Sequence, residues 1–143
     1  MTRLIALLVA GATALALSGC GGESDAEKKK ETAGAGRGEI TCSGAAVTGV
    51  DFPRPDAVTY VKKSEAGPTT IVLGYSTDSL EDTYNAYKDA LDEAGIEIAD
   101  DELEEHDSEI EFERKNAGSE GQIALRATCD NGHVSVRITD RPA

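Results

Sequence analysis

The sequence of 143 residues has little of what catalysis usually requires. It contains only two histidines, His106 and His133, and it lacks an HExxH motif, a Walker loop, a GxGxxG motif and a nucleophile elbow. Carboxylates are abundant, but general acid–base catalysis needs one whose pKa is raised by burial, and the acidic stretches offer no apolar pocket for it. We therefore expect a non-catalytic protein without a cofactor. A hydrolase with scattered active-site residues is the remote alternative.

A membrane-spanning run is also missing. The apolar run over residues 4–17 is interrupted only by Gly11 and Thr13, and it is shorter than the roughly 20 residues that cross a bilayer. No stop-transfer cluster follows it, and Arg3 precedes it. This arrangement is typical of a secretory signal, which we assign to residues 1–19.

The signal ends in Leu17-Ser18-Gly19-Cys20, which resembles the lipobox of bacterial prolipoproteins at all four positions. The resemblance implies that Cys20 carries diacylglycerol and becomes the first residue of the mature chain. Two or three acyl chains would anchor the protein to the membrane without a span. We expect it at the extracytoplasmic face of the cell membrane, or at the outer membrane of a double-membraned cell, since Gly21 is not the retention aspartate.

Residues 20–38 combine this cysteine with a predicted tether. The segment after Cys20 has no large apolar residue, so it has nothing to bury against its ordering entropy. We expect a disordered linker that holds a domain clear of the lipid headgroups. Lys28, Lys29 and Lys30 could touch anionic lipid weakly, but four acidic residues in the segment largely cancel the basic charge.

Basic residues are scarce in the rest of the chain. Residues 39–143 contain 23 Asp and Glu side chains against 9 Lys and Arg, a net charge of −14. Such an excess repels phosphate backbones, which excludes nucleic acid as a partner. The field would instead steer a basic envelope protein or cell-wall component towards the domain. The length fits one domain with one modest core, and we expect it to be monomeric.

Cysteine is rare as well. If Cys20 carries lipid, Cys42 and Cys129 remain as an even pair in an exported protein, which predicts a disulfide between them. Neither lies in a CxxC motif or beside a histidine, which disfavours a reactive or metal-binding thiol pair.

One amphipathic helix is indicated in the middle of the domain. Leu80, Tyr84, Tyr87, Leu91 and Ala94 recur at spacings of four and three, as on one helix face. Its start offers two capping arrangements, Ser79 with Asp82 or Asp78 with Glu81, and Gly95 is a typical residue after a helix end.

Strands are indicated on both sides of this helix. The predicted strands cover residues 58–63, 69–75, 96–98, 108–114, 122–129 and 133–139. Asn131-Gly132 suits a two-residue type I′ turn, which would place Cys129 opposite Val134 and Leu125 opposite Ile138. The order predicts an α+β fold, an antiparallel sheet with one helix across one face. This layout resembles small envelope lipoproteins of unknown function, a resemblance that implies no reaction and no ligand.

The most acidic stretch is residues 100–113, in which nine of fourteen residues are Asp or Glu. The candidate metal ligands there are Asp100, Asp101, Glu105, His106 and Asp107. No EF-hand spacing is present, and Glu109, Glu111 and Glu113 alternate with apolar residues as on the solvent face of a strand. We therefore favour a solvated acidic loop and strand face. The leading function hypothesis is a lipid-anchored binding or accessory domain of the cell envelope, and the alternative is a divalent-cation-binding lipoprotein.

Overall fold

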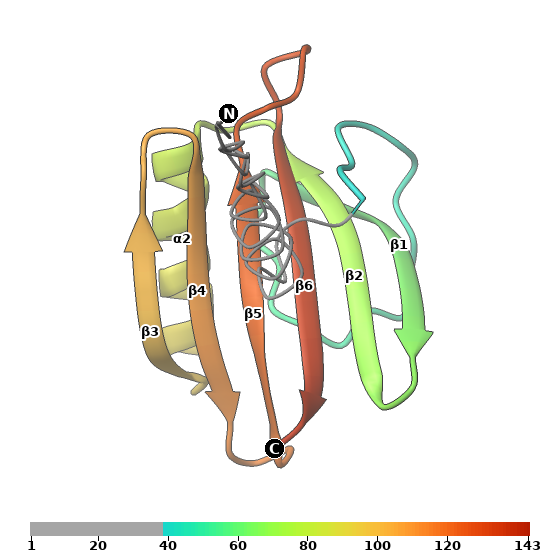
Figure 1. The fold of residues 1–143 in the computed structure, drawn as a ribbon, viewed down its shortest axis with the longest axis vertical. Helices are drawn as coiled ribbons and strands as arrows, with labels where there is room; N and C mark the ends of the chain where they lie inside the picture. Colours follow the sequence, from blue (N-terminus) through green and yellow to red (C-terminus); the bar gives the residue numbers. More distant parts are fainter. Residues whose placement is uncertain (1–38) are drawn as a thin grey trace, which may run out of the picture.

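The computed structural model describes residues 39–143, which form one antiparallel six-stranded sheet with a single helix packed against it (Figure 1). The predicted α+β class is confirmed. The elements are β1 (Val58–Ala66), β2 (Thr69–Ser76), α2 (Leu80–Glu93), β3 (Glu97–Leu103), β4 (Asp107–Arg114), β5 (Ser119–Arg126) and β6 (Val134–Pro142). The predictions for the signal, Cys20 and the tether lie outside the described residues.

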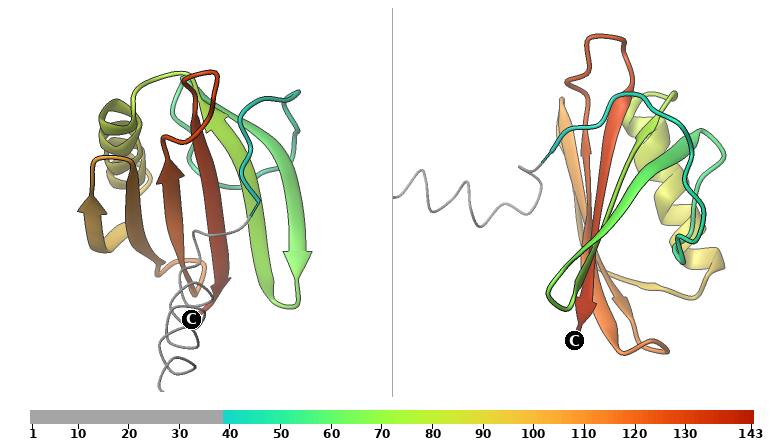
Figure 2. Two further views of the ribbon diagram at one scale, coloured as in Figure 1. Left: turned by 45° about the horizontal axis from the view of Figure 1, so that its top comes forward. Right: turned by 90° about the vertical axis from the view of Figure 1, so that its right-hand side faces the viewer.

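The strands lie in the order β1-β2-β6-β5-β4-β3. β1 and β2 form a hairpin, α2 then carries the chain across one face of the sheet to the opposite edge, and β3 to β6 return as a meander (Figure 2). β6 lies inside the sheet and joins the hairpin to the meander by pairing with both β2 and β5. We call the side that α2 covers the helix face and the other side the outer face.

The helix begins and ends at residues that the sequence indicates. The Oγ of Ser79 accepts a hydrogen bond from the backbone N–H of Asp82 at 3.1 Å, which is the first of the two predicted caps. At the other end Gly95 has φ +69°, and the N–H groups of Gly95 and Ile96 donate to the carbonyls of Asp92 and Leu91. These two bonds form a Schellman motif. Among the described residues, no helix is long and apolar enough to cross a membrane.

The apolar stripe of α2 is confirmed at four of its five positions. Leu80, Tyr84, Tyr87 and Leu91 are buried, whereas Ala94 is exposed. Ala94 is the C-cap, where the chain already turns away from the sheet. Thr83 is buried as well, and its hydroxyl donates to the Oγ of Ser76 at 2.8 Å.

The core lies between α2 and the helix face of the sheet. Its strand residues alternate with outward-pointing residues, as the period of two requires. They are Val58, Tyr60, Val72, Ile110, Phe112, Ile123, Leu125, Val134, Val136 and Ile138. The Tyr87 hydroxyl is 3.1 Å from that of Tyr60, which in turn donates to the carbonyl of Pro53 at 2.7 Å.

The predicted register of the last hairpin is wrong by two residues. Leu125 pairs with Val136 and not with Ile138, and β5 ends at Arg126, before Cys129. The side chains that remain in the two strands keep their predicted faces, but the loop lengthens to residues 127–133. The reason is a tertiary one: Cys129 is bonded to Cys42, and the side chains of Asn131 and His133 both contact the Cys42 carbonyl, at 3.0 and 2.8 Å.

The predicted short strand over residues 96–98 is also wrong in extent. β3 continues to Leu103, with a bulge between Ile98 and Asp100, so Asp100 and Asp101 lie in a strand and not in a loop. Pairing with β4 overrides the low strand propensity of consecutive acidic residues.

Residues 39–57 form no helix or strand and wrap around the β1 side of the sheet from the outer face to the helix face (Figure 2). The sulfur atoms of Cys42 and Cys129 lie at bonding distance, 2.06 Å, in the predicted pairing. The N–H of Val47 donates to the carbonyl of Tyr60 at 2.8 Å, which joins the segment to edge strand β1.

Candidate functional site

The net negative charge of the domain comes from one part of the chain. Residues 80–113, which comprise α2, β3 and β4 except Arg114, contain 15 Asp and Glu and a single basic residue, Lys88. The remaining described residues contain 8 acidic and 8 basic side chains, so their net charge is zero. We call residues 80–113 the acidic region and the rest of residues 39–143 the neutral region.

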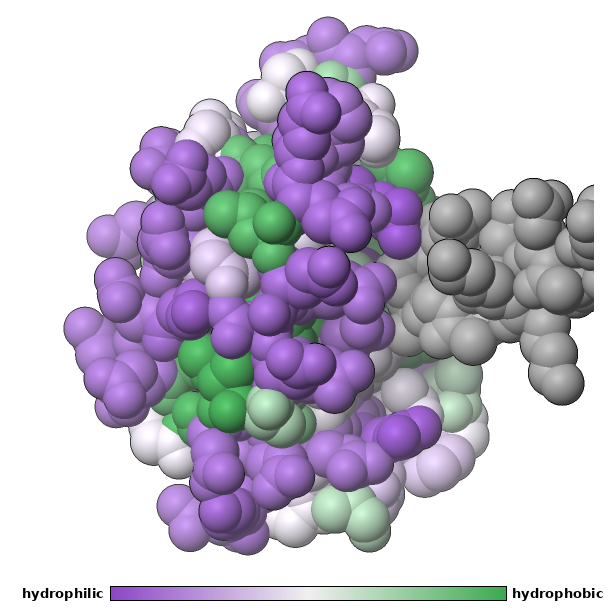
Figure 3. All heavy atoms as spheres, turned by 60° about the vertical axis from the view of Figure 1, so that its left-hand side comes forward, coloured by the Kyte–Doolittle hydropathy of each residue, from purple (hydrophilic) through white to green (hydrophobic). Residues whose placement is uncertain are grey.

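The acidic region occupies one side of the molecule. α2 presents Glu81, Asp82, Asp89, Asp92 and Glu93 to solvent, next to the exposed edge strand β3. This side is covered largely by hydrophilic residues (Figure 3). An acidic surface here follows from the sequence, because the helix stripe and the strand alternation leave these side chains no place in the core.

Like charges face one another across the β3–β4 pair on the outer face. The register places Glu97 opposite Glu113, Asp100 opposite Glu111, and Glu102 opposite Glu109. Side chains directly opposite one another in a sheet have Cβ atoms about 5 Å apart, and like charges in such pairs are destabilising. Two of these pairs could not be expected from a predicted strand that ends at Ile98, because Asp100 and Glu102 lie beyond it. The alternation of Glu109, Glu111 and Glu113 indicated the row of acids on β4 but not the row on β3 that faces it.

The predicted metal-ligand candidates are separated by the same strand geometry. Asp100 points to the outer face, whereas Asp101 points to the helix face, where it meets α2. Glu105 and His106 lie in the β3–β4 turn with side chains 88% and 73% exposed. Asp107 begins β4 and is 3.9 Å from Arg126. Within residues 39–143, no three His, Cys, Asp or Glu side chains are arranged to hold a metal ion.

Asp101 is instead part of a contact between β3 and α2. Its Oδ2 accepts hydrogen bonds from the Tyr84 hydroxyl and from the Lys88 ammonium, the latter at 2.7 Å. The bond to Lys88 lowers the pKa of Asp101, and the bond to Asp101 raises the pKa of Lys88. The one basic residue of the acidic region therefore serves an internal contact.

Three carboxylates repel one another at the tip of the β3–β4 hairpin. The negative charges of Asp107 and Glu102 raise the pKa of the Glu104 carboxyl above its usual range. The backbone N–H of Glu104 donates to the carbonyl of Asp107 at 2.8 Å, so the turn itself holds these side chains together. A cation brought to this surface would be attracted by several carboxylates at once.

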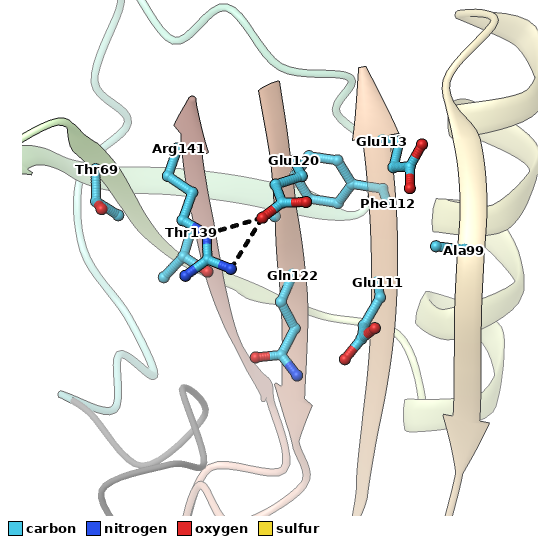
Figure 4. Close-up of a pocket in the computed structure, with 10 residues that line it drawn as sticks. Thr69, Ala99, Glu111, Phe112, Glu113, Glu120, Gln122, Thr139 and Arg141 are labelled. Carbon is cyan, nitrogen blue, oxygen red and sulfur yellow. Dashed lines mark hydrogen bonds and ion pairs between the residues drawn. The ribbon is translucent and has the colours of Figure 1, made fainter. Parts of the chain in front are cut away.

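A shallow trough of about 430 Å³ adjoins the acidic rows on the outer face (Figure 4). Glu111 and Glu113 of β4 line one side, and Arg141 of β6 lines the other, where it donates to the Oε1 of Glu120 at 2.9 Å. Gln122 lies between them and donates to the Glu109 carboxylate at 2.9 Å. The trough lies where the outer face changes from acids that face acids on β3 and β4 to the Arg141–Glu120 ion pair on β5 and β6.

Comparison of the chain with models of protein families, with curated proteins and with solved structures gives no match.

Proposed function

We propose that the chain is a lipid-anchored, extracytoplasmic, non-catalytic binding domain of the bacterial cell envelope, and that its acidic region binds a basic envelope protein or cell-wall component. The observation that supports this proposal is the three like-charge pairs between β3 and β4. Like charges opposite one another destabilise a sheet, an effect that Lys115 offsets at Glu97, and a partner that presents Lys or Arg side chains would turn the repulsion in the other two pairs into attraction.

Anchoring and charge act together in this proposal. The lipobox at Leu17-Ser18-Gly19-Cys20 supports a lipid on Cys20, and the net charge of −14 over residues 39–143 would keep the domain away from anionic headgroups. The same field raises the association rate for a basic partner, and it is screened over a Debye length of about 8 Å at physiological ionic strength. Association should therefore slow steeply as salt rises.

Crosslinking and pull-down from intact cells tests the binding surface. The test variant is D100N/E102Q/E109Q/E111Q, which neutralises the two of the three like-charge pairs that lie nearest the β3–β4 turn. The matched control D56N/E65Q/D78N/D130N removes the same number of charges from exposed positions of the neutral region. We expect the parent and the control to capture the same basic partner and the test variant to lose it. A partner captured equally by all three would contradict the proposal.

The alternative, a divalent-cation-binding lipoprotein, is tested on the same variants. Calcium or zinc would then raise the melting temperature of the parent and not that of the test variant.

The lipid anchor is tested by Cys20→Ser, which should abolish incorporation of radiolabelled lipid, and normal labelling of that variant would refute the anchor. Turnover of ester, phosphate or glycan substrates by the purified protein would overturn the non-catalytic assignment.

A further inference from the structure

The two edges of the sheet differ in what covers them. The edge at β1 is shielded by the segment before it: the N–H of Val47 donates to the carbonyl of Tyr60 at 2.8 Å, and the Nζ of Lys63 donates to the carbonyl of Gly49 at 3.2 Å. β3 forms the other edge, at the left of Figure 1, and among residues 39–143 no segment pairs with it on the side away from β4. An edge strand with open backbone groups is a template for a further strand.

The backbone of β3 directs two residues towards this open edge. The N–H of Glu104 donates across the hairpin to the first residue of β4 at 2.8 Å, and the residues that bond the neighbouring strand alternate along an antiparallel strand. Glu102 and Asp100 therefore also face β4, whereas Leu103 and Asp101 direct their N–H and C=O groups outward. The N–H of Asp101 agrees with this direction, because it donates to the Oδ1 of its own neighbour Asp100 at 2.9 Å.

The side chains of β3 determine what an added strand must carry. On the outer face Asp100 and Glu102 are exposed and lie opposite Glu111 and Glu109 of β4. On the helix face lies Leu103, which is 40% exposed and is one of three exposed large apolar side chains of the described residues. Side chains directly beside these on an added strand would have Cβ atoms about 5 Å away. Basic side chains therefore suit the outer face of that strand, and an apolar side chain suits the position beside Leu103.

A second copy of the chain does not suit this edge. Pairing of β3 with β3 would bring Asp100 and Glu102 of one copy beside the same acids of the other, and two domains with a net charge of −14 each would repel one another. The edge at β1 of another copy is shielded by the segment that contains Val47 and Gly49. The acids therefore oppose self-association through β3 and leave its edge open to a strand of opposite charge.

We propose that β3 accepts an extended segment of the basic partner as a further strand of the sheet. In this segment Lys or Arg alternates with apolar residues: the basic side chains lie beside Asp100 and Glu102, and an apolar one lies beside Leu103. Its backbone bonds the outward groups of Leu103 and Asp101, and the exposed bond from the Asp101 N–H to Asp100 is exchanged for one to the partner. This inference rests on the proposed function and narrows the partner to a protein with such a segment.

The test is an NMR titration of the full-length chain with two capped hexapeptides of the same composition. Lys-Val-Lys-Val-Lys-Val has the alternation of the proposed strand, and Lys-Lys-Lys-Val-Val-Val has the same charge without it. We expect the alternating peptide to shift the amide signals of Asp101 and Leu103 saturably, to slow hydrogen exchange at Leu103, and to bind about tenfold more tightly than the block peptide. Equal affinities, or shifts confined to other residues, would overturn strand addition and leave the proposed function standing. Saturable binding of neither peptide would contradict both.

A substitution at Leu103 separates main-chain pairing from charge. Leu103→Pro removes an N–H that faces the open edge and keeps every charge, so it should lower the affinity for the alternating peptide about tenfold and leave that for the block peptide unchanged. The matched control Leu103→Ala keeps the N–H and should lower the affinity only about threefold, through the lost apolar contact. Parent-like affinity in Leu103→Pro, or an equal loss in both variants, would contradict main-chain pairing. If the amide signals of β4 show that proline disturbs the hairpin, the comparison of the two peptides on the parent decides.

Discussion

The acidic and neutral regions share one sheet and one core, yet they treat charge in opposite ways. In the neutral region bases meet acids, as Arg114 meets Asp140 at 2.8 Å and Arg141 meets Glu120 at 2.9 Å. In the acidic region the one base, Lys88, is bonded to Asp101, and on the outer face acids face acids. The difference indicates that packing and internal pairing stabilise the domain, while the outer face of the acidic region keeps like charges opposite one another.

Two kinds of side-chain polar contact cross the boundary between the regions. In the core, the hydroxyls of Tyr60 and Tyr87 and those of Ser76 and Thr83 meet. Towards the surface, Lys115 pairs with Glu97, Arg126 lies 3.9 Å from Asp107, and Gln122 donates to Glu109. Exposed ion pairs of this kind contribute about 0–1 kcal/mol each. The continuous backbone ladder between β4 and β5 and the common core therefore join the two regions, and the strongest test of the comparison lies at that seam.

The largest effect is expected for Gly121→Ala at the β4–β5 seam. A Cβ at Gly121 would lie 1.9 Å from the carbonyl oxygen of Thr139 and 2.6 Å from the tip of the Phe112 ring. Since the backbone must shift, we expect a loss of about 3 kcal/mol in the free energy of unfolding, measured by urea denaturation.

Gly118→Ala is the control for this substitution. Its Cβ would meet nothing within 4 Å, and its φ of +63° should cost only about 1–2 kcal/mol. The helix signal in circular dichroism and the tyrosine fluorescence should report one common transition in both variants. Separate transitions would show that the acidic and neutral regions unfold independently and that the shared core does not couple them.

The second effect concerns the disulfide, which lies entirely within the neutral region. Replacing both Cys42 and Cys129 with serine releases a loop with a sequence separation of 87 residues, and we expect a loss of about 2–4 kcal/mol. Hydrogen exchange should speed up most at Val47, whose N–H is bonded to Tyr60, and least in the β3–β4 ladder. An equal loss of protection in β3–β4 would mean that the disulfide supports both regions.

The helix and the presence of strands on both sides of it could be predicted from local sequence, whereas the strand order could not. The stripe from Leu80 to Leu91 and the Ser79 cap are local features, and local features are what periodicity reports. The last hairpin shows where this reasoning ends. Asn131-Gly132 has the residues of a tight turn, but the loop is held by Cys42, which lies 89 residues from Asn131. The disulfide and the two side-chain contacts to Cys42 outweigh the local preference of Asn131-Gly132 for a tight turn.

The acidic surface and one cavity of the molecule differ in the same respect. Acidity between residues 80 and 113 is visible in the sequence, although the like-charge pairs depend on how far β3 extends. The cavity that Phe52, Arg114 and Asp140 line was not predictable. Asp140 and Arg114 are 26 residues apart and meet only because the registers of β4, β5 and β6 align them, and Phe52 reaches them from an irregular segment. No spacing rule relates these three residues.

The third effect concerns the hydroxyl contacts that link α2, through Tyr60 of β1, to the segment before β1. Tyr60→Phe should cost about 1–3 kcal/mol, because it leaves both the buried Tyr87 hydroxyl and the Pro53 carbonyl without their bonds. Tyr87→Phe removes only the first of these bonds and leaves Tyr60 bonded to Pro53, so about 1 kcal/mol is expected. Thermal melting of the two variants gives the order. A larger loss for Tyr87→Phe would mean that the hydroxyl chain does not join the regions in this way.

The smallest effect, and the one specific to the acidic region, is a dependence on pH of opposite sign at two nearby carboxylates. The pKa of Glu104 is raised above its ordinary value of 4.5 by Asp107 and Glu102, so the charged form is disfavoured in the folded state. Its repulsion is fully present at pH 7 and disappears as pH falls through the raised pKa and then 4.5. Glu104→Gln should therefore raise the melting temperature slightly at pH 7 and have no effect well below pH 4.5.

Asp101 should behave in the opposite way. Its pKa is lowered from 3.8 by Lys88 and Tyr84, so its contribution to stability is complete above pH 3.8 and is lost as pH falls through the lowered value. Asp101→Asn should thus lower the melting temperature at pH 7, and the difference from the parent should shrink only below pH 3.8. Because Glu104 is exposed and Asp101 is half-buried, high salt should reduce the effect of Glu104→Gln more than that of Asp101→Asn. Melting curves from pH 7 to pH 3 for both variants and the parent give the two profiles. If Glu104→Gln and Asp101→Asn changed the melting temperature in the same direction at pH 7, the acidic region would not contain both a stabilising and a destabilising carboxylate. The proposal that a basic partner relieves repulsion in this region would then lose its support.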